Sequence, residues 1–247
     1  MMLAAWPGVG NVALIVARYL VEKLSAEEIG ELEAFHFFEP MGVLVKDNVV
    51  EAPQFPENKF YYWRNPSNPQ GDLLLFLGES QPTSKAYELA QCILDVAQTF
   101  KARRIYTCAA ALVRMHYTEK SKVWGVSTSN RHLRQFKGYD VVLRGDLQIA
   151  GMNGILLGVA KQRNIEGSCL LGEVPLYATR IPNPKAALAV TEILTKVLGV
   201  SIDMEELTEN SRETEEAMKR LADQAMGEFI DHYTKPIWPP QEEEEEE

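Results

Sequence analysis

The stretch DLLLFLG, residues 72–78, is a continuous apolar run bounded by an aspartate and a glycine. A run of this length without polar alternation is typical of a central strand that is buried on both faces of a sheet. The helix expected next, at residues 83–100, carries apolar residues at helical spacing on one face, and another apolar segment follows at residues 104–109. A buried strand, an amphipathic helix and a second buried strand predict a parallel β-α-β unit.

The same alternation extends towards both ends of the chain, with short hairpin-like segments between its members. The other strands are expected at residues 1–6, 33–38, 60–64, 123–126, 139–144 and 168–171, with a hairpin at 43–50. The other helices of the alternation are expected at residues 11–24, 154–162 and 184–198. Asn11 is a suitable N-cap for the first, whereas Asn183, Pro184 and Gly199 mark the two ends of the last. The chain is therefore predicted to have an α/β fold, a three-layer α/β/α arrangement around a mostly parallel, mixed sheet.

The composition of the sequence becomes more acidic after residue 200, and we divide the chain there. Residues 1–200 are predicted to form the α/β core domain, and residues 201–236 a C-terminal acidic helical extension. Docking of this extension on its own domain and contact with a second copy are about equally consistent with its apolar stripe. The stripe contains Met218, Leu221, Ala222, Ala225, Met226, Phe229 and Ile230. Residues 237–247, which end in six glutamates, are predicted to be a disordered acidic tail.

Composition places the chain among ordinary globular proteins. Hydrophobic residues make up 46% and charged residues 24%, and the six terminal glutamates supply more than half of the formal net charge of −10. The near-neutral remainder, without a recognisable nucleic-acid-binding module, argues against a nucleic acid partner. No apolar run is long enough to cross a bilayer and no secretion signal is visible, so we expect a cytoplasmic protein with no membrane partner.

The chain carries no recognisable catalytic motif. Cys92, Cys108 and Cys169 are widely spaced, and we expect them to be reduced and mostly buried. The signatures of serine hydrolases, zinc proteases and P-loop proteins are missing, so no catalytic residue, metal or cofactor is predicted. A triad assembled from distant residues stays compatible with the sequence, because triad members need not be neighbours in the chain.

Two turns rich in glycine and asparagine each open a helix. Helix N-termini offer free N–H groups to anions, so the two turns together predict a ligand crevice. The candidate ligand-binding residues of these turns are Gly8, Gly10, Asn11, Gly151, Asn153 and Gly154. The first turn also reads G-x-G-x-x-A, which leaves a dinucleotide site as an alternative, although Glu39, the supporting acid, lies farther along the chain than the usual roughly twenty residues. A tight turn that needs glycine for packing explains it more simply.

Two glutamates, Glu79 and Glu173, each follow a buried strand and a glycine. Ligands of open parallel sheets bind beyond the carboxyl ends of the strands, where two carboxylates can bind Mg²⁺ or act as acid and base. Alternatively, each carboxylate accepts hydrogen bonds from nearby N–H groups, and we favour this structural interpretation.

Residues 101–144 depart from the near-neutral charge of the core, with ten lysines and arginines against Glu119 and Asp140. A patch for an acidic partner protein is one interpretation. Charges scattered over several solvated elements are the simpler one.

Seven segments share an order and pattern that together are fairly specific. They are AWPGVGNVA at 5–13, FFEP at 37–40, LLLFLGESQP at 73–82, RIYTCAA at 104–110, GMNGILLG at 151–158, LLGEVPLYA at 170–178 and NPKAALAVTEILTKVLGVSIDMEEL at 183–207. In this order the chain resembles the proteasome assembly chaperone family, of the second assembly chaperone type with its archaeal relatives. The resemblance covers nearly the whole chain up to about residue 207.

This resemblance implies a phosphorylase/hydrolase-like α/β/α fold, a homo-oligomer and a role in assembling proteasome α-subunits. Some family members dock through a C-terminal tail of a hydrophobic residue, a tyrosine and any last residue. This chain departs from that pattern, because it ends in glutamates and its nearest tyrosine is Tyr233. The alternative function is a nucleotide- or phosphate-binding enzyme, similar to ATP-dependent carboxylate–amine ligases, with a site at the carboxyl ends of the strands.

Overall fold

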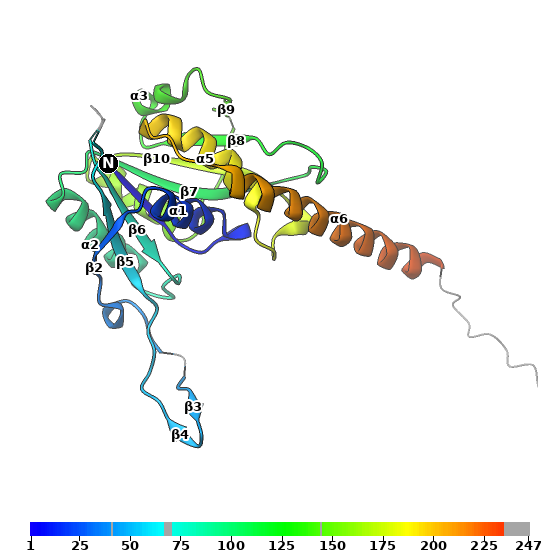
Figure 1. Ribbon diagram of the computed structural model, residues 1–247, viewed down its shortest axis with the longest axis horizontal. Helices are drawn as coiled ribbons and strands as arrows, with labels where there is room; N and C mark the ends of the chain where they lie inside the picture. Colours follow the sequence, from blue (N-terminus) through cyan, green and yellow to red (C-terminus); the bar gives the residue numbers. More distant parts are fainter. Residues whose placement is uncertain (41, 67–70, 144, 235–247) are drawn as a thin grey trace, which may run out of the picture.

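The computed structural model describes residues 1–40, 42–66, 71–143 and 145–234. An eight-stranded sheet forms its centre, in the order β2-β5-β6-β1-β7-β10-β8-β9 (Figure 1). Its strands are β1 (Met2–Ala5), β2 (Glu27–Glu31), β5 (Asn58–Trp63), β6 (Leu73–Gly78), β7 (Arg104–Val113), β8 (Val123–Ser127), β9 (Val141–Val142) and β10 (Glu166–Pro175). A separate hairpin is formed by β3 (Val45–Lys46) and β4 (Val49–Val50).

The four central strands, β6, β1, β7 and β10, are parallel, and strands next to them on both sides run antiparallel. Leu3 of β1 lies between Leu75 and Tyr106 of its two neighbours, so β1 is buried along its length. The predicted mostly parallel, mixed sheet is therefore confirmed, and residues 72–78 contribute one of its central strands.

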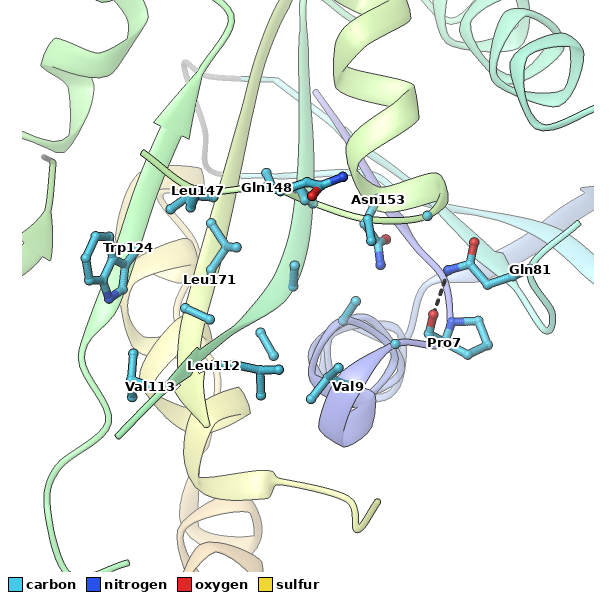
Figure 2. A pocket seen from close by; sticks show the side chains of 18 of the residues that line it. Pro7, Val9, Gln81, Leu112, Val113, Trp124, Leu147, Gln148, Asn153 and Leu171 are labelled. Carbon is cyan, nitrogen blue, oxygen red and sulfur yellow. Dashed lines mark hydrogen bonds between the residues drawn. The ribbon is translucent and has the colours of Figure 1, made fainter. Parts of the chain in front are cut away.

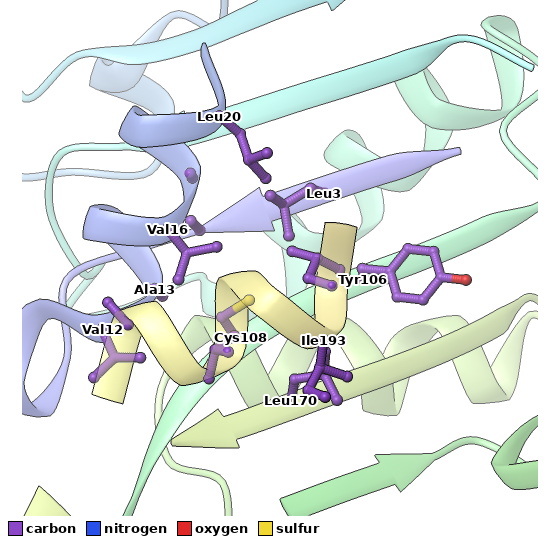
Figure 3. Packing of buried hydrophobic residues seen from close by; sticks show 14 of the residues in the cluster. Leu3, Val12, Ala13, Val16, Leu20, Tyr106, Cys108, Leu170 and Ile193 are labelled. Atoms are coloured by element: carbon purple, nitrogen blue, oxygen red, sulfur yellow. The ribbon is translucent and has the colours of Figure 1, made fainter. Parts of the chain in front are cut away.

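Helices cover both faces of the sheet. They are α1 (Val12–Lys23), α2 (Ala86–Thr99), α3 (Asn130–Leu133), α4 (Met152–Gln162), α5 (Pro184–Leu198) and α6 (Glu205–Thr234), and the short 3-10 helices are η1 (Val9–Asn11), η2 (Ala34–His36), η3 (Arg134–Phe136) and η4 (Leu176–Ala178). The buried residues of α1 and α5 form one core cluster with the sheet, and those of α2 and α4 form another on the opposite face. Figure 3 shows Val16 and Leu20 of α1 directed towards Leu3, with α5 packed beside them.

The caps of α5 agree with the sequence. The Asn183 side chain accepts a hydrogen bond from the Ala186 N–H at 2.9 Å, and Gly199 ends the helix with a φ of 68°. Asn11 occupies the predicted N-cap position of α1, but it has a φ of 49° and its side chain caps no N–H group. The preceding residues form η1, and the Asn11 N–H donates to the Gly8 carbonyl, which leads the chain into α1 through a left-handed residue.

The strand predicted at residues 33–38 is also wrong. The chain forms η2 there, and Ala34 and Phe38, four residues apart, are both buried against the core. The edge strand is instead β2, whose five residues are all exposed. Because neither face of β2 is buried, its sequence EEIGE carries no alternation that would reveal a strand.

The acidic extension forms α6, which packs against α5 at its start and then leaves the body (Figure 1). The residues of α6 that face the body share a spacing of three and four and are buried; they are Leu207, Ser211, Thr214 and Met218. The tail at 237–247 lies outside the described residues, and the division at residue 200 stays a prediction. Within the described ranges, no helix combines the length and apolarity that a membrane span requires.

Candidate functional site

A cavity of about 660 Å³ lies at the carboxyl ends of β1, β7 and β10 (Figure 2). Cavities of this size and position commonly hold ligands in α/β proteins. Its wall contains the turn after β1, the end of β7 and the segment before α4; the residues are Pro7, Gly8, Val9, Ala13, Gln81, Ala109, Ala110, Ala111, Leu112, Val113, Trp124, Asp146, Leu147, Gln148, Ile149, Ala150, Gly151, Asn153 and Leu171.

Small side chains on β7 leave room for this cavity. Ala109, Ala110 and Ala111 follow one another at the strand's end, where larger residues would fill the space. On the side of β8, the ring of Trp124 is held by a hydrogen bond of 2.8 Å from its Nε1 to Glu173 Oε1. The cavity is thus an open, mostly apolar hollow with one wall fixed by an indole.

Two amide side chains join the two glycine turns. Asn153 is 3% exposed, and its Oδ1 accepts from the Trp6 N–H at 3.2 Å while its Nδ2 donates to the Trp6 carbonyl at 3.3 Å. Gln81 Nε2 donates to the Pro7 carbonyl at 2.7 Å, and its Oε1 accepts from the Met152 N–H at 2.9 Å. The turns after β1 and before α4 are therefore held side by side at the cavity.

The structure brings three of the six candidate residues of the turns to the cavity: Gly8, Gly151 and Asn153. Gly10 lies beneath the start of α5, because a Cβ atom there would meet the Asn183 Cβ at 2.9 Å, and its φ is 62°. Asn11 is exposed outside the cavity wall, and Gly154 packs so closely on Ile149 that a Cβ would lie 2.1 Å from the Ile149 carbonyl oxygen. Ligand binding by the six residues stays a prediction, and Gly10 and Gly154 have packing roles.

Glu79 and Glu173 do not meet. Glu79 directly follows β6, as predicted, whereas Glu173 lies within β10, because that strand continues to Pro175. The two strands are separated by β1 and β7, which corresponds to about 14 Å across the sheet. Glu79 Oε2 accepts from the Glu57 N–H at 2.9 Å, and Glu173 Oε2 accepts from the Lys122 N–H at 3.2 Å. Neither carboxylate lines the cavity, and each has the structural role that we favoured from the sequence.

The cavity presents little charge. Asp146 is the one ionisable side chain among the described lining residues, so no lysine or arginine of this set would neutralise a phosphate group. The described residues also contain no group of three or more His, Cys, Asp or Glu side chains that could hold a metal ion. The wall as described therefore favours an uncharged, largely apolar group over a nucleotide.

The cysteines are poor nucleophiles. Burial raises the pKa of the Cys108 thiol well above its usual range and raises that of Cys169 to about 12. Both side chains are fully buried, as expected from the sequence, and Cys92 is partly exposed on α2.

The basic residues of 101–143 lie on several elements. Arg104 Nε pairs with Glu166 at 3.2 Å, and Lys120 Nζ lies 3.9 Å from Asp140. This distribution agrees better with scattered, partly paired charges than with one binding patch.

Sequence reasoning missed two of the residues that shape this site. Gln81 follows β6 in the stretch FLGESQP, and its position after a buried strand was the available signal. Trp124 faces the cavity from β8 (Figure 2). Its role depends on the pairing of β8 with β10, for which the sequence offers no local signal.

Comparison with known proteins agrees with this arrangement. The PAC2 family model matches residues 2–222. An uncharacterized protein of Methanocaldococcus jannaschii is 31% identical over 224 residues, which cover 90% of this chain and 82% of that protein.

Two solved archaeal structures are similar over most of their length. PbaB of Pyrococcus furiosus, an archaeal proteasome activator, is 33% identical with a TM-score of 0.76, covering 90% of this chain and 92% of that one. PbaA of the same organism, an archaeal homolog of proteasome-assembly chaperone, is 25% identical with a TM-score of 0.69, covering 91% and 92%. Since the family model spans most of the sequence and these relatives share its fold, the chain belongs to the PAC2 family.

Proposed function

We propose that this chain is a homo-oligomeric protein-binding factor that assists the assembly or activity of the proteasome through its α-subunits. The observation that carries the proposal is the 33% identity to PbaB, a proteasome activator, across 90% of the chain. The similarity to PbaA points to the same process. The weakly charged cavity and the separated glutamates supply no acid–base or phosphate-binding constellation that would favour the alternative enzyme.

The helix α6 supports a role in protein contact. Its first half is anchored on the body: Lys185 Nζ donates to Glu215 Oε1 at 2.5 Å, and Lys23 Nζ donates to Glu206 Oε2 at 2.7 Å. Met218 is buried, whereas Met226, two turns further along, is 60% exposed. An anchored helix that carries an apolar side chain such as Met226 into solvent is suited to contact another protein.

The direct test mixes the purified chain with separately purified archaeal α-subunits and, in parallel, with assembled 20S particles. We expect co-elution in size-exclusion chromatography with light scattering, together with a change in ring formation or in hydrolysis of a fluorogenic peptide. The proposal fails if, at micromolar concentration, the chain co-elutes with neither the α-subunits nor the 20S particles and leaves the rates of ring formation and of peptide hydrolysis unchanged.

Two variants separate the elements involved. A chain ending at Thr234 removes the acidic tail, and we expect it to keep binding if the contact does not depend on the terminus. Met226→Glu places a charge on the exposed part of α6 and is expected to weaken binding, whereas Lys219→Glu alters an exposed side chain without removing apolar surface. Equal binding by both substituted chains and the parent would exclude α6 from the contact.

A further inference from the structure

The hairpin of β3 and β4 lies at the end of a long arm, defined here as residues 42–55, that extends away from the body (Figure 1). Asp47 and Asn48 form its turn with φ values of 50° and 64°, the left-handed conformation of a tight two-residue hairpin. The Glu51 N–H donates to the Leu44 carbonyl at 2.9 Å and continues the ladder by one step. Residues 44–51 of the arm therefore form a two-stranded ribbon.

One face of this ribbon is entirely apolar. Val45 lies opposite Val50, and alternation along the strand puts Val43 on the same side. The other face mixes Leu44 and Val49 with the charged Lys46 and Glu51. Val45 and Val50 are 63% and 64% exposed, so the body of the same chain does not cover the apolar face.

An uncovered ribbon of this kind is energetically unfavourable. A single two-stranded hairpin is marginally stable in water, and exposed apolar patches on soluble proteins commonly mark interaction sites. An arm that keeps one face apolar therefore indicates a binding partner that covers this face.

A concave surface with apolar lining lies beside the segments that lead into and out of the arm. This edge groove has a volume of about 450 Å³ and lies between the edge of the sheet and α2; its apolar residues are Ile29, Leu32, Phe37, Phe60, Val96 and Phe100. Ile29 and Phe100 are 43% and 45% exposed, and Cys92 also lines the wall. Leu32 and Phe37 precede the arm in the chain and Phe60 follows it, so the arm leaves and re-enters the body beside the groove.

We propose that the apolar face of the arm covers the edge groove of a second copy of this chain, and that the contact is reciprocal. This proposal rests on the proposed function, which takes the chain to be a homo-oligomer. In a two-fold dimer, every contact between residue i of one copy and residue j of the other is repeated with the copies exchanged. An arm that covers the partner's groove therefore has its own groove covered in return, provided that arm and groove lie close together on the chain. The arm and the groove meet this condition.

The buried area favours exchange of two arms over insertion of one. An extended chain exposes roughly 160 Å² per residue, so a half-exposed arm of this length offers on the order of 1,000 Å², about half of which a groove can cover. One arm in one groove then buries about 1,000 Å² over both partners, the lower limit for a specific interface, and a reciprocal pair buries about 2,000 Å². A second copy supplies this doubling without any additional partner.

Substitutions on the two faces test the contact. Val45→Asp charges the apolar face, and Val49→Asp makes the same change on the mixed face at equal exposure. In sedimentation of the full chain over a range of concentrations, we expect Val45→Asp to raise the dimer dissociation constant at least ten-fold, and Val49→Asp to change it much less. Circular dichroism and thermal melting of both variants check that the core is intact.

Native Cys92 makes the contact directly detectable, since the other two cysteines are fully buried. A chain with Val50→Cys, treated with a short bismaleimide, should form a covalent dimer that disappears when Cys92→Ala is added. Val49→Cys is the matched control and should cross-link much less.

Three outcomes overturn the proposal: equal effects of the two aspartate substitutions, a cross-link confined to one chain, or a covalent dimer that persists without Cys92. The last result would mean that arms contact arms and not the groove. Because no proteasome subunit is present in these experiments, their failure is distinct from failure of the proposed function.

Discussion

Asn153 offers the sharpest test of how the cavity is built. Its amide pairs with both backbone groups of Trp6 and thereby fastens the turn before α4 to the end of β1. Thr107 Oγ1 also donates to the Asn153 carbonyl at 2.9 Å, so this position lies at the junction of three segments. Asn153→Ala removes the side-chain bonds and leaves the Thr107 bond in place.

The expected loss follows from burial of the groups left behind. Each intramolecular hydrogen bond contributes about 1 kcal/mol, and each buried group that loses its partner costs about 1–3 kcal/mol. Since the two bonds are long, at 3.2 and 3.3 Å, we take the lower part of this range and expect a loss of about 3 kcal/mol. For a chain of this size that corresponds to a decrease of roughly 6–12 °C in Tm.

Urea denaturation followed by tryptophan fluorescence measures this loss, because Trp6 is fully buried and lies beside the altered bond. Gln148→Ala is the matched control: it truncates another amide on the same cavity, at an exposed position, and should change stability by less than about 0.5 kcal/mol. If Asn153→Ala and the control lie within 0.5 kcal/mol of each other, roughly the spread of ordinary surface substitutions, Asn153 does not hold the two turns together.

Three further outcomes follow from local contacts. Asn183→Ala removes the acceptor at the start of α5 and should lower the unfolding free energy, measured by urea titration, by about 1 kcal/mol. Asn183→Ser keeps a capping oxygen and should retain most of the parental stability. Gly78→Ala would place a Cβ atom 2.3 Å from Trp6 Nε1, so we expect the unfolding free energy to fall by at least about 2 kcal/mol and the near-ultraviolet circular dichroism to change. An unfolding free energy and a spectrum equal to those of the parent chain would contradict this packing. A hydrogen bond from the Tyr62 hydroxyl is the largest cause that lowers the pKa of Asp72 below its ordinary value. The resulting stabilisation is present above the pKa of Asp72 in the unfolded chain and is lost as pH falls through its pKa in the folded chain. Tyr62→Phe should therefore reduce the slope of the unfolding free energy against pH on the acid side. An unchanged slope would refute the role of this hydrogen bond.

The sequence predicts the interior of this fold better than its edges. The helix α5 was expected at residues 184–198, and it is found there, because Asn183, Pro184 and Gly199 are local signals that act without tertiary contacts. The edge strand β2 has no such signal, since an exposed strand gains nothing from apolar alternation. The strand β10 was expected only at residues 168–171, yet it runs from Glu166 to Pro175 because β7 pairs along its whole length.

The candidate site also combines features that local sequence predicts with features that depend on the whole sheet. The sequence placed Gly8 and Gly151 beside two helix starts, and the structure brings both to one cavity. It placed Glu79 correctly after a strand, whereas Glu173 lies inside β10, and the order of strands decides which residues are neighbours. That order depends on the packing of the whole sheet, so two residues with the same local signature lie on opposite sides of β1 and β7.

The docking interpretation of the acidic helix agrees with the first half of α6. A stripe at helical spacing is buried only as far as the body extends, and this limit falls near Met218 of α6. Beyond it the helix continues into solvent (Figure 1), and Met226 is exposed although its residue type matches the buried stripe. The exposed Met226 is apolar surface on an anchored helix, and such surface is suited to contact with another chain. The first half of α6 therefore explains how the extension is held on the body, and contact of the second half with another chain is the prediction that Met226→Glu tests.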